Sequence, residues 1–256
     1  MKFTCYSNSS AKSENAKKQI ENKLVTGGWQ LENDSPDLVI SVGGDGTVLA
    51  AVQKYLADLE RVVFLGVNTG TLGFFTDYQG DEIDCMIEEL LSEKVFTIEK
   101  KRLIVGDVAG KKYYALNEIR LENNIHTQIF DVTIDGKWFE TYRGSGLNFS
   151  SQAGSTGYNR SLRGAILDDS NQNLQMSEIS PISNRHFRTL GYPLVLNSER
   201  TIELSWENKA NIILGYDHLV TDLCQTNKVK IKLSDKEVRF IHYRNIDFLD
   251  RIKLLY

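Results

Sequence analysis

Three glycines surround a single carboxylate in the segment GGDGT, residues 43–47, which follows an apolar run and precedes a helical pattern. Glycine lets the backbone approach an anion, and successive N–H groups can line a phosphate. A carboxylate among such groups repels phosphate unless it binds a cation or accepts a proton, and both roles occur in phosphoryl transfer. We therefore predict that Asp45 is a catalytic base. The phosphate-binding residues would be Gly43, Gly44, Gly46 and Thr47.

The same segment also has a simpler interpretation. A tight strand-to-helix turn favours glycine as well, and Asp45 or Thr47 could cap the helix that follows. However, the carboxyl end of a parallel strand is where open α/β sheets bind ligands, and a helix N-terminus adds partial positive charge there. Three glycines around one aspartate at such a position favour the functional interpretation.

A second segment rich in glycine and threonine, NTGTLGF, occupies residues 68–74 directly after the apolar run 61–67. Adjacent parallel strands end at the same edge of a sheet, so the two segments would form a two-sided phosphate cradle. Taken alone, the segment would be equally compatible with a plain loop. Its residues assigned to ATP or phosphate are Asn68, Gly70 and Thr71.

The first hundred residues alternate strand-like and helical patterns, which predicts a mainly parallel sheet with helices on its faces. Ser9 or Ser10 can cap the first helix, and Gly27-Gly28 can end it. The predicted strands span residues 2–6, 38–42 and 61–67, and the later helices span residues 48–59 and 81–91.

After about residue 95 the pattern changes to short strands, which predicts an antiparallel β domain. Asp135-Gly136 is a hairpin turn signal between two of them. The polar, glycine- and serine-rich residues 143–164 form a long insertion that we expect to be irregular and functional. The predicted strands span residues 95–108, 113–121, 127–134, 138–143, 194–196, 201–205, 212–214, 228–233 and 237–243.

These patterns define the expected fold class and its boundaries. We predict an α/β N-terminal domain with a mainly parallel sheet over residues 1–95, followed by an antiparallel all-β, sandwich-like C-terminal domain over residues 96–242. Residues 243–256 mix apolar and charged side chains, which indicates a tail that packs back on the N-terminal domain.

The composition of the 256 residues is that of an ordinary globular protein, with 41% hydrophobic and 25% charged residues. The net charge of −4 argues against nucleic acid or an anionic membrane as a partner. No apolar stretch approaches 18 residues, so we predict no membrane span, and the polar N-terminus is not a signal peptide. The three cysteines and four histidines show neither disulfide nor metal-site spacing, which is typical of the reducing cytoplasm.

Four segments occur in the order GGDGT, NTGTLGF, ALNE at residues 115–118 and GSTGY at residues 154–158. Their sequences, order and spacing resemble the NAD kinase family, and the likeness covers nearly the whole chain. Residues 142–147, 159–165, 184–191 and 216–218 also resemble the short bacterial branch of that family.

The resemblance implies an enzyme, a phosphotransferase with an alcohol group as acceptor. The reaction would move the γ-phosphoryl of ATP, with Mg²⁺ or another divalent cation, onto the 2′-hydroxyl of the adenosine ribose of NAD to give NADP. Residues 96–242 would be the NAD-binding domain, with NAD in the cleft between the domains. The resemblance further implies a homo-oligomer, either a dimer or a tetramer.

By the same resemblance, Asp45 would be the base for the 2′-hydroxyl, Asn117 and Glu118 would contact the ribose, and residues 156–158 with Ser161 would line the adenine pocket. Neighbouring residues of a strand point to opposite faces, so we expect a strand end at Asn117-Glu118. The full set assigned to NAD is Asp45, Gly46, Asn117, Glu118, Arg143, Ser145, Ala153, Thr156, Gly157, Tyr158, Ser161, Ser180 and His218.

Three positions depart from the family pattern, all on the NAD-binding side. Ser145 stands where the family usually has an aspartate, and residues 151–154 read Ser-Gln-Ala-Gly where it usually has Thr-Pro-Thr/Ser-Gly. Gly157 stands where an alanine is common. An unmade ligand hydrogen bond costs about 1–3 kcal/mol, so these changes bear on NAD affinity more than on the type of reaction.

Two other functions remain open at the level of sequence. Lipid and sphingoid-base kinases share GGDGT, although they usually continue with a Glu-Val-like helix start and lack NTGTLGF. A non-catalytic paralogue that senses NAD or NADP would keep Asp45 and vary at Ser145 and Gln152. The sequence also leaves open whether ATP or polyphosphate is the donor, whether NADH is accepted, and which metal is preferred.

Overall fold

The computed structural model describes residues 1–256 except 72, 93, 124, 208–210, 245 and 254–256. The chain forms two compact units, one made of residues 1–100 with 237–256 and the other of residues 101–236. Each unit has a hydrophobic core of its own. Over the described residues, no helix combines the length and apolar character that a bilayer crossing requires.

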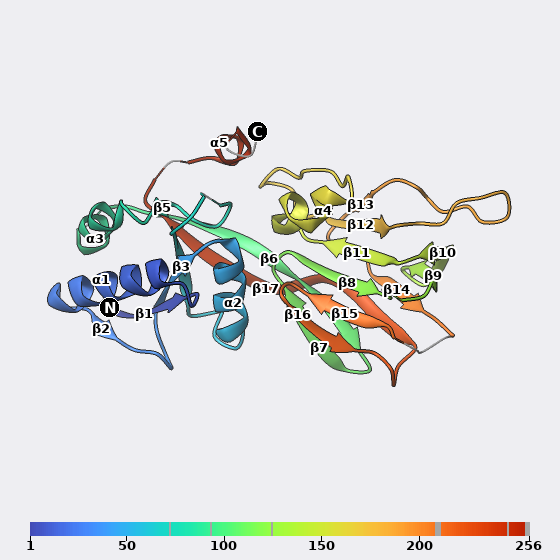
Figure 1. Cartoon of the computed structure of the whole chain (residues 1–256), viewed down its shortest axis with the longest axis horizontal. Coiled ribbons are helices and arrows are strands. Elements are labelled where there is room, and N and C mark those ends of the chain that lie inside the picture. Colours follow the sequence, from blue (N-terminus) through green and yellow to red (C-terminus); the bar gives the residue numbers. More distant parts are fainter. Residues whose placement is uncertain (72, 93, 124, 208–210, 245, 254–256) are drawn as a thin grey trace. The chain divides into compact units, whose positions relative to one another are not determined.

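The first unit is built on a parallel sheet with the strand order β2-β1-β3-β4 (Figure 1). Strand β3, which lies between β1 and β4, is buried at all six positions, as its mostly apolar sequence LVISVG predicts. A short strand, β5, pairs in parallel with β4 on the other side. The strands are β1 (Lys2–Ser7), β2 (Gln30–Leu31), β3 (Leu38–Gly43), β4 (Val63–Asn68) and β5 (Tyr78–Gln79).

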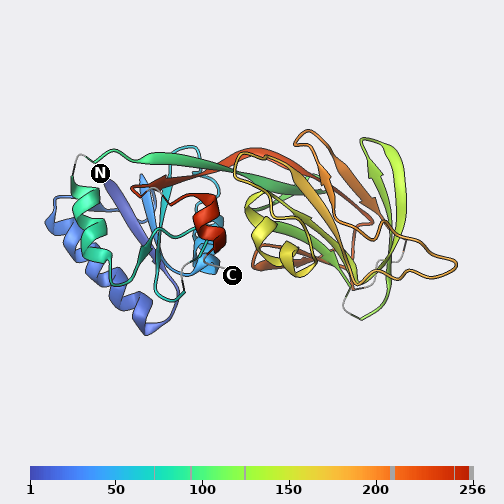
Figure 2. The same ribbon diagram turned by 90° about the horizontal axis from the view of Figure 1, so that it is seen from above.

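Helices α1 (Ala11–Thr26) and α3 (Ile83–Leu91) pack side by side against one face of this sheet (Figure 2). Ser10 caps α1 by accepting a hydrogen bond from the backbone N–H of Ser13, and Gly27 ends it, as predicted. Helix α2 (Asp45–Lys54) packs against the sheet through an apolar stripe of its own, which includes Val48, Ala51 and Val52.

The prediction for α2 was wrong at both ends. The helix begins at Asp45 because Gly44, in an extended conformation, is its N-cap, so Thr47 lies inside the first turn instead of capping it. The helix ends at Lys54, and Tyr55 and Leu59 are buried in the turns that follow. Their burial produces the apolar pattern that extended the predicted helix to residue 59.

The second unit is a pair of antiparallel sheets whose apolar faces enclose one core, so the prediction of an antiparallel β domain is confirmed. One sheet has the order β13-β12-β11-β8-β15-β16, and the other contains β10-β9-β14 with the first part of β17, together with β6 and β7. The strands are β6 (Thr97–Val108), β7 (Lys111–Ala115), β8 (Glu118–Glu122), β9 (Gln128–Ile134), β10 (Lys137–Gly144), β11 (Gly146–Ser150), β12 (Leu174–Ile179), β13 (Leu194–Leu196), β14 (Ile202–Ser205), β15 (Ile213–Tyr216), β16 (Leu219–Asp222) and β17 (Lys228–His242).

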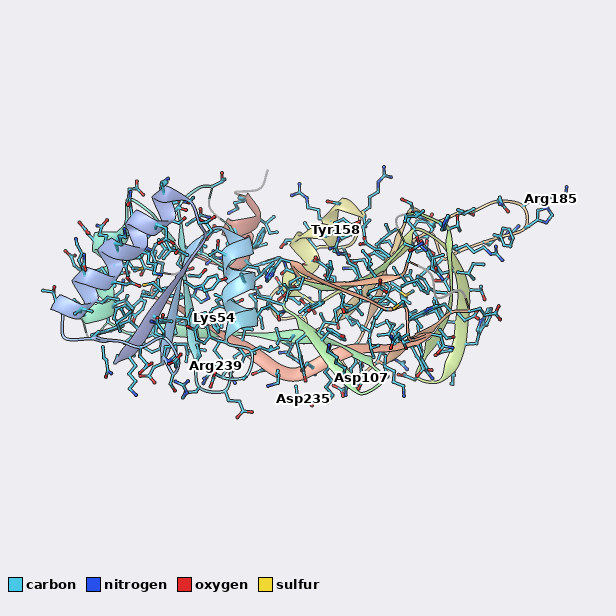
Figure 3. The ribbon with its side chains drawn as sticks, turned by 60° about the horizontal axis from the view of Figure 1, so that its bottom comes forward. Lys54, Asp107, Tyr158, Arg185, Asp235 and Arg239 are labelled. Atoms are coloured by element: carbon cyan, nitrogen blue, oxygen red, sulfur yellow. The ribbon has the colours of Figure 1, made fainter. Side chains whose placement is uncertain are left out.

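One hairpin turn and one long loop of this unit connect neighbouring antiparallel strands. Asp135 and Gly136 have φ values of 50° and 77° and connect β9 to β10, which confirms the predicted hairpin turn. The loop between β12 and β13 carries Arg185 at its tip (Figure 3).

Three strand predictions need correction. The predicted strand 113–121 is two strands, because the chain passes from one sheet to the other at residues 116–117. The predicted irregular insertion 143–164 contains β11, which is buried at all five positions but has polar Asn148 and Ser150 on one face. The predicted strands 228–233 and 237–243 are one continuous strand, β17.

The unit boundaries differ from the predicted domains 1–95 and 96–242. Residues 237–242 of β17 belong to the first unit, because Phe240 pairs in parallel with Phe64 of β4 and its ring stacks on Phe75. The tail region contains α5 (Phe248–Lys253), whose Arg251 is buried on the first unit. Leu254 and Leu255, also expected to pack, lie outside the described residues.

Candidate active site

The carboxylate of Asp45 joins the two glycine-rich segments of the first unit. Strand β3 ends at Gly43 and α2 begins at Asp45, whose Oδ2 accepts a hydrogen bond from the Phe74 N–H at 2.9 Å. Its Oδ1 accepts a second from the Phe75 N–H at 3.1 Å. A Cβ at Gly73 would lie 2.1 Å from that Oδ1, so only glycine fits there. The interpretation of Asp45 as a simple helix cap is therefore wrong, since its carboxylate binds another loop.

The glycines of GGDGT have different surroundings. A Cβ at Gly43 would lie 2.1 Å from Thr47 Oγ1, so Gly43 is required for the strand-to-helix turn. A Cβ at Gly44 or Gly46 would meet nothing within 4 Å. The backbone of these two residues is accessible at the N-terminus of a ten-residue helix, which is a suitable place for a phosphate. Thr47 is buried and contributes to the packing of the turn.

Asn68 shapes the second loop from inside. Its buried side chain accepts a hydrogen bond from the Gly70 N–H at 2.6 Å and donates one to the Thr71 carbonyl at 2.5 Å. Gly70 and Thr71 are exposed, and Leu72, in the middle of the motif, lies outside the described residues. Asn68 thus supports the loop from inside, whereas Gly70 and Thr71 are exposed on it, so a role in phosphate binding stays a prediction for these two residues.

In the second unit, Asn117 and Glu118 lie where β7 ends and β8 begins, which confirms the expected strand end. The carboxylate of Asp217 holds this turn, because it accepts hydrogen bonds from the Leu116 and Asn117 N–H groups, both at 2.8 Å. The Asp217 N–H in turn donates to the Glu118 carbonyl at 3.1 Å. Sequence reasoning noted residues 216–218 but assigned a role to His218 alone, which is exposed beside Asp217.

The predicted adenine loop lies directly against this turn. Its glycines allow the contact, since a Cβ at Gly154 would lie 2.1 Å from the Asn117 carbonyl oxygen. A Cβ at Gly157 would lie 3.4 Å from Asn117 Nδ2 and 3.7 Å from Glu118 Oε2, so the family's alanine would fit. The loop residues placed here are Ala153 and Thr156 in a short 3₁₀ turn, Gly157, and Tyr158 and Ser161 in α4 (Tyr158–Ser161; Figure 3).

Two buried oxygen atoms of this turn are open acceptors. Asn117 Oδ1 and Glu118 Oε2 have no hydrogen-bond partner among the described residues. Burial raises the pKa of Glu118 to about 7, with the charge of Asp217 raising it further and that of Arg120 opposing. Arg120 also lies over the Tyr158 ring, 4.8 Å from its centroid. Buried acceptors without partners are costly, and hydroxyl donors of a ligand would satisfy them.

Arg143, Ser145 and Ser180 form a separate group at the other end of β8. The Ser145 N–H donates to the Ile179 carbonyl at 3.0 Å, and the Ser145 carbonyl accepts from the Asn123 N–H at 2.8 Å. Asn123 is five residues beyond Glu118, or ~16 Å along an extended strand. Within one chain, the structure therefore does not bring these three residues together with Asn117 and Glu118, and only an extended ligand could reach both groups.

Comparison with known proteins identifies the family. Residues 2–95 match the family model of the ATP-NAD kinase N-terminal domain, and residues 116–243 match that of the ATP-NAD kinase C-terminal domain. The chain belongs to the NAD kinase family. This confirms the resemblance carried by the four motifs and removes the case for a lipid kinase.

Relatives and solved structures of the NAD kinase family agree over the full length. NAD kinase 1 of Bacillus cereus is 35% identical over 258 residues, covering 99% of this chain and 97% of that protein, and the NAD kinase of Enterococcus faecalis is 36% identical with the same coverage. Yeast NADH kinase complexed with NADH has the same fold, with a TM-score of 0.84, 18% identity, and coverage of 100% of this chain and 87% of that one. An Archaeoglobus fulgidus NAD kinase in complex with ATP gives a TM-score of 0.80 at 22% identity, covering 100% and 98%.

The departure at residue 152 from the family pattern has a structural explanation. Gln152 donates from its side chain to the Leu167 carbonyl at 3.2 Å and to Asp169 Oδ1 at 2.9 Å. It therefore ties the predicted adenine loop to the segment that follows, and these contacts do not involve Ser145. This geometry therefore argues against the idea that Gln152 compensates for the missing carboxylate at Ser145.

We expect Ser145→Asp, which restores the family's carboxylate, to tighten NAD binding several-fold, or by about 1 kcal/mol, because a carboxylate is a stronger acceptor than a hydroxyl. Isothermal titration with NAD measures the change, and Ser145→Asn is the matched uncharged control. The Gln152→Pro and double variants complete the series. Weaker binding in the single aspartate variant, restored by Gln152→Pro, would show that the site is built around serine.

Proposed function

We propose that the protein is an active NAD kinase, which transfers the γ-phosphoryl group of ATP to the 2′-hydroxyl of the adenosine ribose of NAD. The observation that carries this proposal is the pair of open buried acceptors, Asn117 Oδ1 and Glu118 Oε2, in a chain of this family. A ribose offers two adjacent hydroxyl donors, which match two adjacent acceptors. The neighbouring loop, residues 153–158, then supplies the adenine contacts.

The first unit would supply the phosphate site and the base. The N–H groups around Gly44 and Gly46 approach the phosphates of ATP, and the N-terminus of α2 adds partial positive charge. Asp45 would take the proton of the 2′-hydroxyl while the oxygen of that hydroxyl forms a bond to the γ-phosphorus of ATP. The bond between the γ-phosphorus and the bridging oxygen breaks at the same time, and ADP leaves with its electrons. The hydrogen bonds from Phe74 and Phe75 fix the carboxylate for that step.

A divalent cation would accompany ATP. Among the described residues, no three His, Cys, Asp or Glu side chains gather into a metal site, and both oxygens of Asp45 already accept backbone hydrogen bonds. The donor set of the first unit therefore fits a cation held mainly by phosphate oxygens and water, as Mg²⁺ prefers. When bound, it would neutralise charge on the transferred phosphoryl group.

The test is an assay of the purified protein with NAD, ATP and Mg²⁺, in which an NADP-specific dehydrogenase detects the product. We expect NADP to form, and phosphorus NMR to place the new phosphate on the 2′-oxygen. Parallel reactions with polyphosphate or NADH define the donor and the acceptor range. Binding of NAD by titration without any NADP formation would instead show a non-catalytic paralogue.

We expect the KM for NAD to fall as pH rises through about 7, because Glu118 ionises there and a carboxylate accepts a ribose hydrogen bond more strongly than a carboxylic acid. In Glu118→Gln this step should be absent. Because the pKa of Glu118 is higher in the folded chain than in the unfolded chain, Glu118 contributes its full stabilisation below pH 4.5, which is the ordinary pKa of a glutamate. This stabilisation is lost as pH rises through about 7. Steady-state kinetics and thermal unfolding from pH 5.5 to 8.5 check both; identical profiles for wild type and Glu118→Gln would contradict them.

A further inference from the structure

Arg251 of α5 is a buried cation that binds the loop holding Asp45. Only 7% of its surface is exposed. Its Nη1 donates to the carbonyl of Thr76 at 2.7 Å and to that of Gly73 at 3.4 Å, and its Nη2 pairs with the carboxylate of Asp77. Arg251 belongs to none of the glycine-rich motifs and was not assigned to nucleotide binding. In the sequence it lies far from residues 73–77, which it contacts.

The contact with Gly73 has a specific consequence. The carbonyl of Gly73 and the N–H of Phe74 belong to the same peptide group. Arg251 therefore binds the oxygen of the amide whose N–H donates to Asp45 Oδ2. A cation at the carbonyl polarises the amide and strengthens its N–H as a donor. Arg251 and Asp45 thus bind the two ends of one peptide group. The hydrogen bond from Arg251 to the Thr76 carbonyl holds the residues that follow in the same loop.

The guanidinium is itself held by a network of charged groups within the first unit, of which Arg251 and Asp77 are buried and His242 and Glu99 partly buried. Asp77, only 3% exposed, contacts His242 Nδ1 at 2.7 Å, and His242 Nε2 lies 3.2 Å from Glu99 Oε2. Burial would lower the pKa of His242, but its hydrogen bonds to Asp77 and Glu99 outweigh this and raise the pKa to about 9. His242 is therefore cationic at neutral pH, and Asp77 joins two cations. Such a fixed network keeps Arg251 in one position.

We propose that Arg251 is a positioning residue for the base, acting through the Gly73–Phe74 peptide group to hold the carboxylate of Asp45. We call the two contacts on this peptide group, Arg251 with the Gly73 carbonyl and Asp45 with the Phe74 N–H, the clasp. The catalytic consequence rests on the proposed function, whereas the clasp itself is a property of the folded chain. Residues beyond the nucleotide motifs therefore take part in aligning the γ-phosphoryl transfer.

Three variants test the proposal. Arg251→Met removes the charge and keeps most of the side-chain volume, and Arg251→Lys keeps the charge but cannot reach both carbonyls and Asp77. Arg239→Met is the matched control, because Arg239 (Figure 3) also donates to backbone carbonyls, those of Glu60 and Val62, but not to the Asp45 loop. Thermal unfolding is measured for all three.

We expect amide hydrogen exchange at Phe74 and Phe75 to become at least tenfold faster in Arg251→Met, whereas Leu65 in β4 and all amides of the second unit keep their protection. We expect kcat to fall about 10- to 100-fold, the range typical of a misplaced catalytic group. The KM for NAD should stay within twofold. Arg251→Lys should be intermediate, and Arg239→Met should match wild type in both measurements.

The two measurements separate the possible failures. Unchanged exchange at Phe74 and Phe75 in Arg251→Met would overturn the clasp, whether or not the protein makes NADP. Faster exchange with unchanged kcat would overturn the catalytic consequence and leave the proposed function intact. Wild-type protein that forms no NADP would overturn the proposed function and with it the role in catalysis, and the exchange data would still decide the clasp.

Discussion

Asp45→Asn is expected to lower kcat for NADP formation by about 100- to 10,000-fold, the usual cost of removing a general base. An amide cannot take the proton of the 2′-hydroxyl. Its NH₂ group would also face one of the two N–H donors, Phe74 or Phe75, that now bind the carboxylate. The loss should therefore appear in kcat, with ATP and NAD still bound.

Asp81→Asn is a suitable control for this change, since Asp81 is an exposed aspartate of the same unit. Steady-state kinetics, titration of both nucleotides and thermal unfolding should be measured for each variant. Losing one of the two partly buried hydrogen bonds costs about 1 kcal/mol, so a modest drop in Tm is expected for Asp45→Asn alone. Turnover within a few-fold of wild type would show that Asp45 is not the base.

Valine at Gly44 or Gly46 is expected to weaken ATP binding by about 10- to 100-fold while the protein stays folded. Hydrogen bonds from backbone N–H groups to a charged phosphate are each worth about 1.5–3 kcal/mol, and 1.4 kcal/mol corresponds to tenfold in Kd. A Cβ at either position would meet no other heavy atom within 4 Å, so we expect the valine side chain to fit the fold and to extend into the space that a phosphate would occupy.

Ala50→Val is the matched control, because it adds similar bulk to the same helix away from the loop. Titration with ATP and Mg²⁺ gives the affinities, and circular dichroism with thermal unfolding reports the fold. Normal ATP affinity combined with unfolding would mean that these glycines serve the turn and not the nucleotide.

Some of the site was readable from sequence because its residue types are unusual. A carboxylate among three glycines after an apolar strand is informative wherever it occurs. The strand end at Asn117-Glu118 followed from the family resemblance, which implies that both residues contact one ribose, together with the opposite directions of neighbouring side chains on a strand. The partners of Asp45 were not predictable. They are backbone N–H groups of Phe74 and Phe75, which every residue but proline possesses, so no side chain marks them.

Other features escaped prediction because their partners are distant or their patterns misleading. Asp217 binds the Asn117 N–H from 100 positions away in the chain, and one sequence without its contacts gives no sign of that pairing. Strand β11 was mistaken for loop because Asn148 and Ser150 make its sequence polar, although both are fully buried. Hydrophobic periodicity cannot detect a strand whose buried face is polar.

The interrupted first unit has a consequence for how the protein is made. A ribosome synthesises residues 1–100, then the whole of residues 101–236, and only afterwards the residues that complete the first unit. Nascent domains generally fold in order from the N-terminus. Here the second unit can finish folding before Phe240, the partner of β4, has been synthesised. Arg251, the partner of the Asp45 loop, is synthesised later still. Translation that stops within residues 237–250 would release a chain in which the turn at Asn117-Glu118 is complete and the Asp45 loop lacks Arg251. If Asp45 is the base, as we propose, such truncated products would be inactive because of the order of synthesis alone.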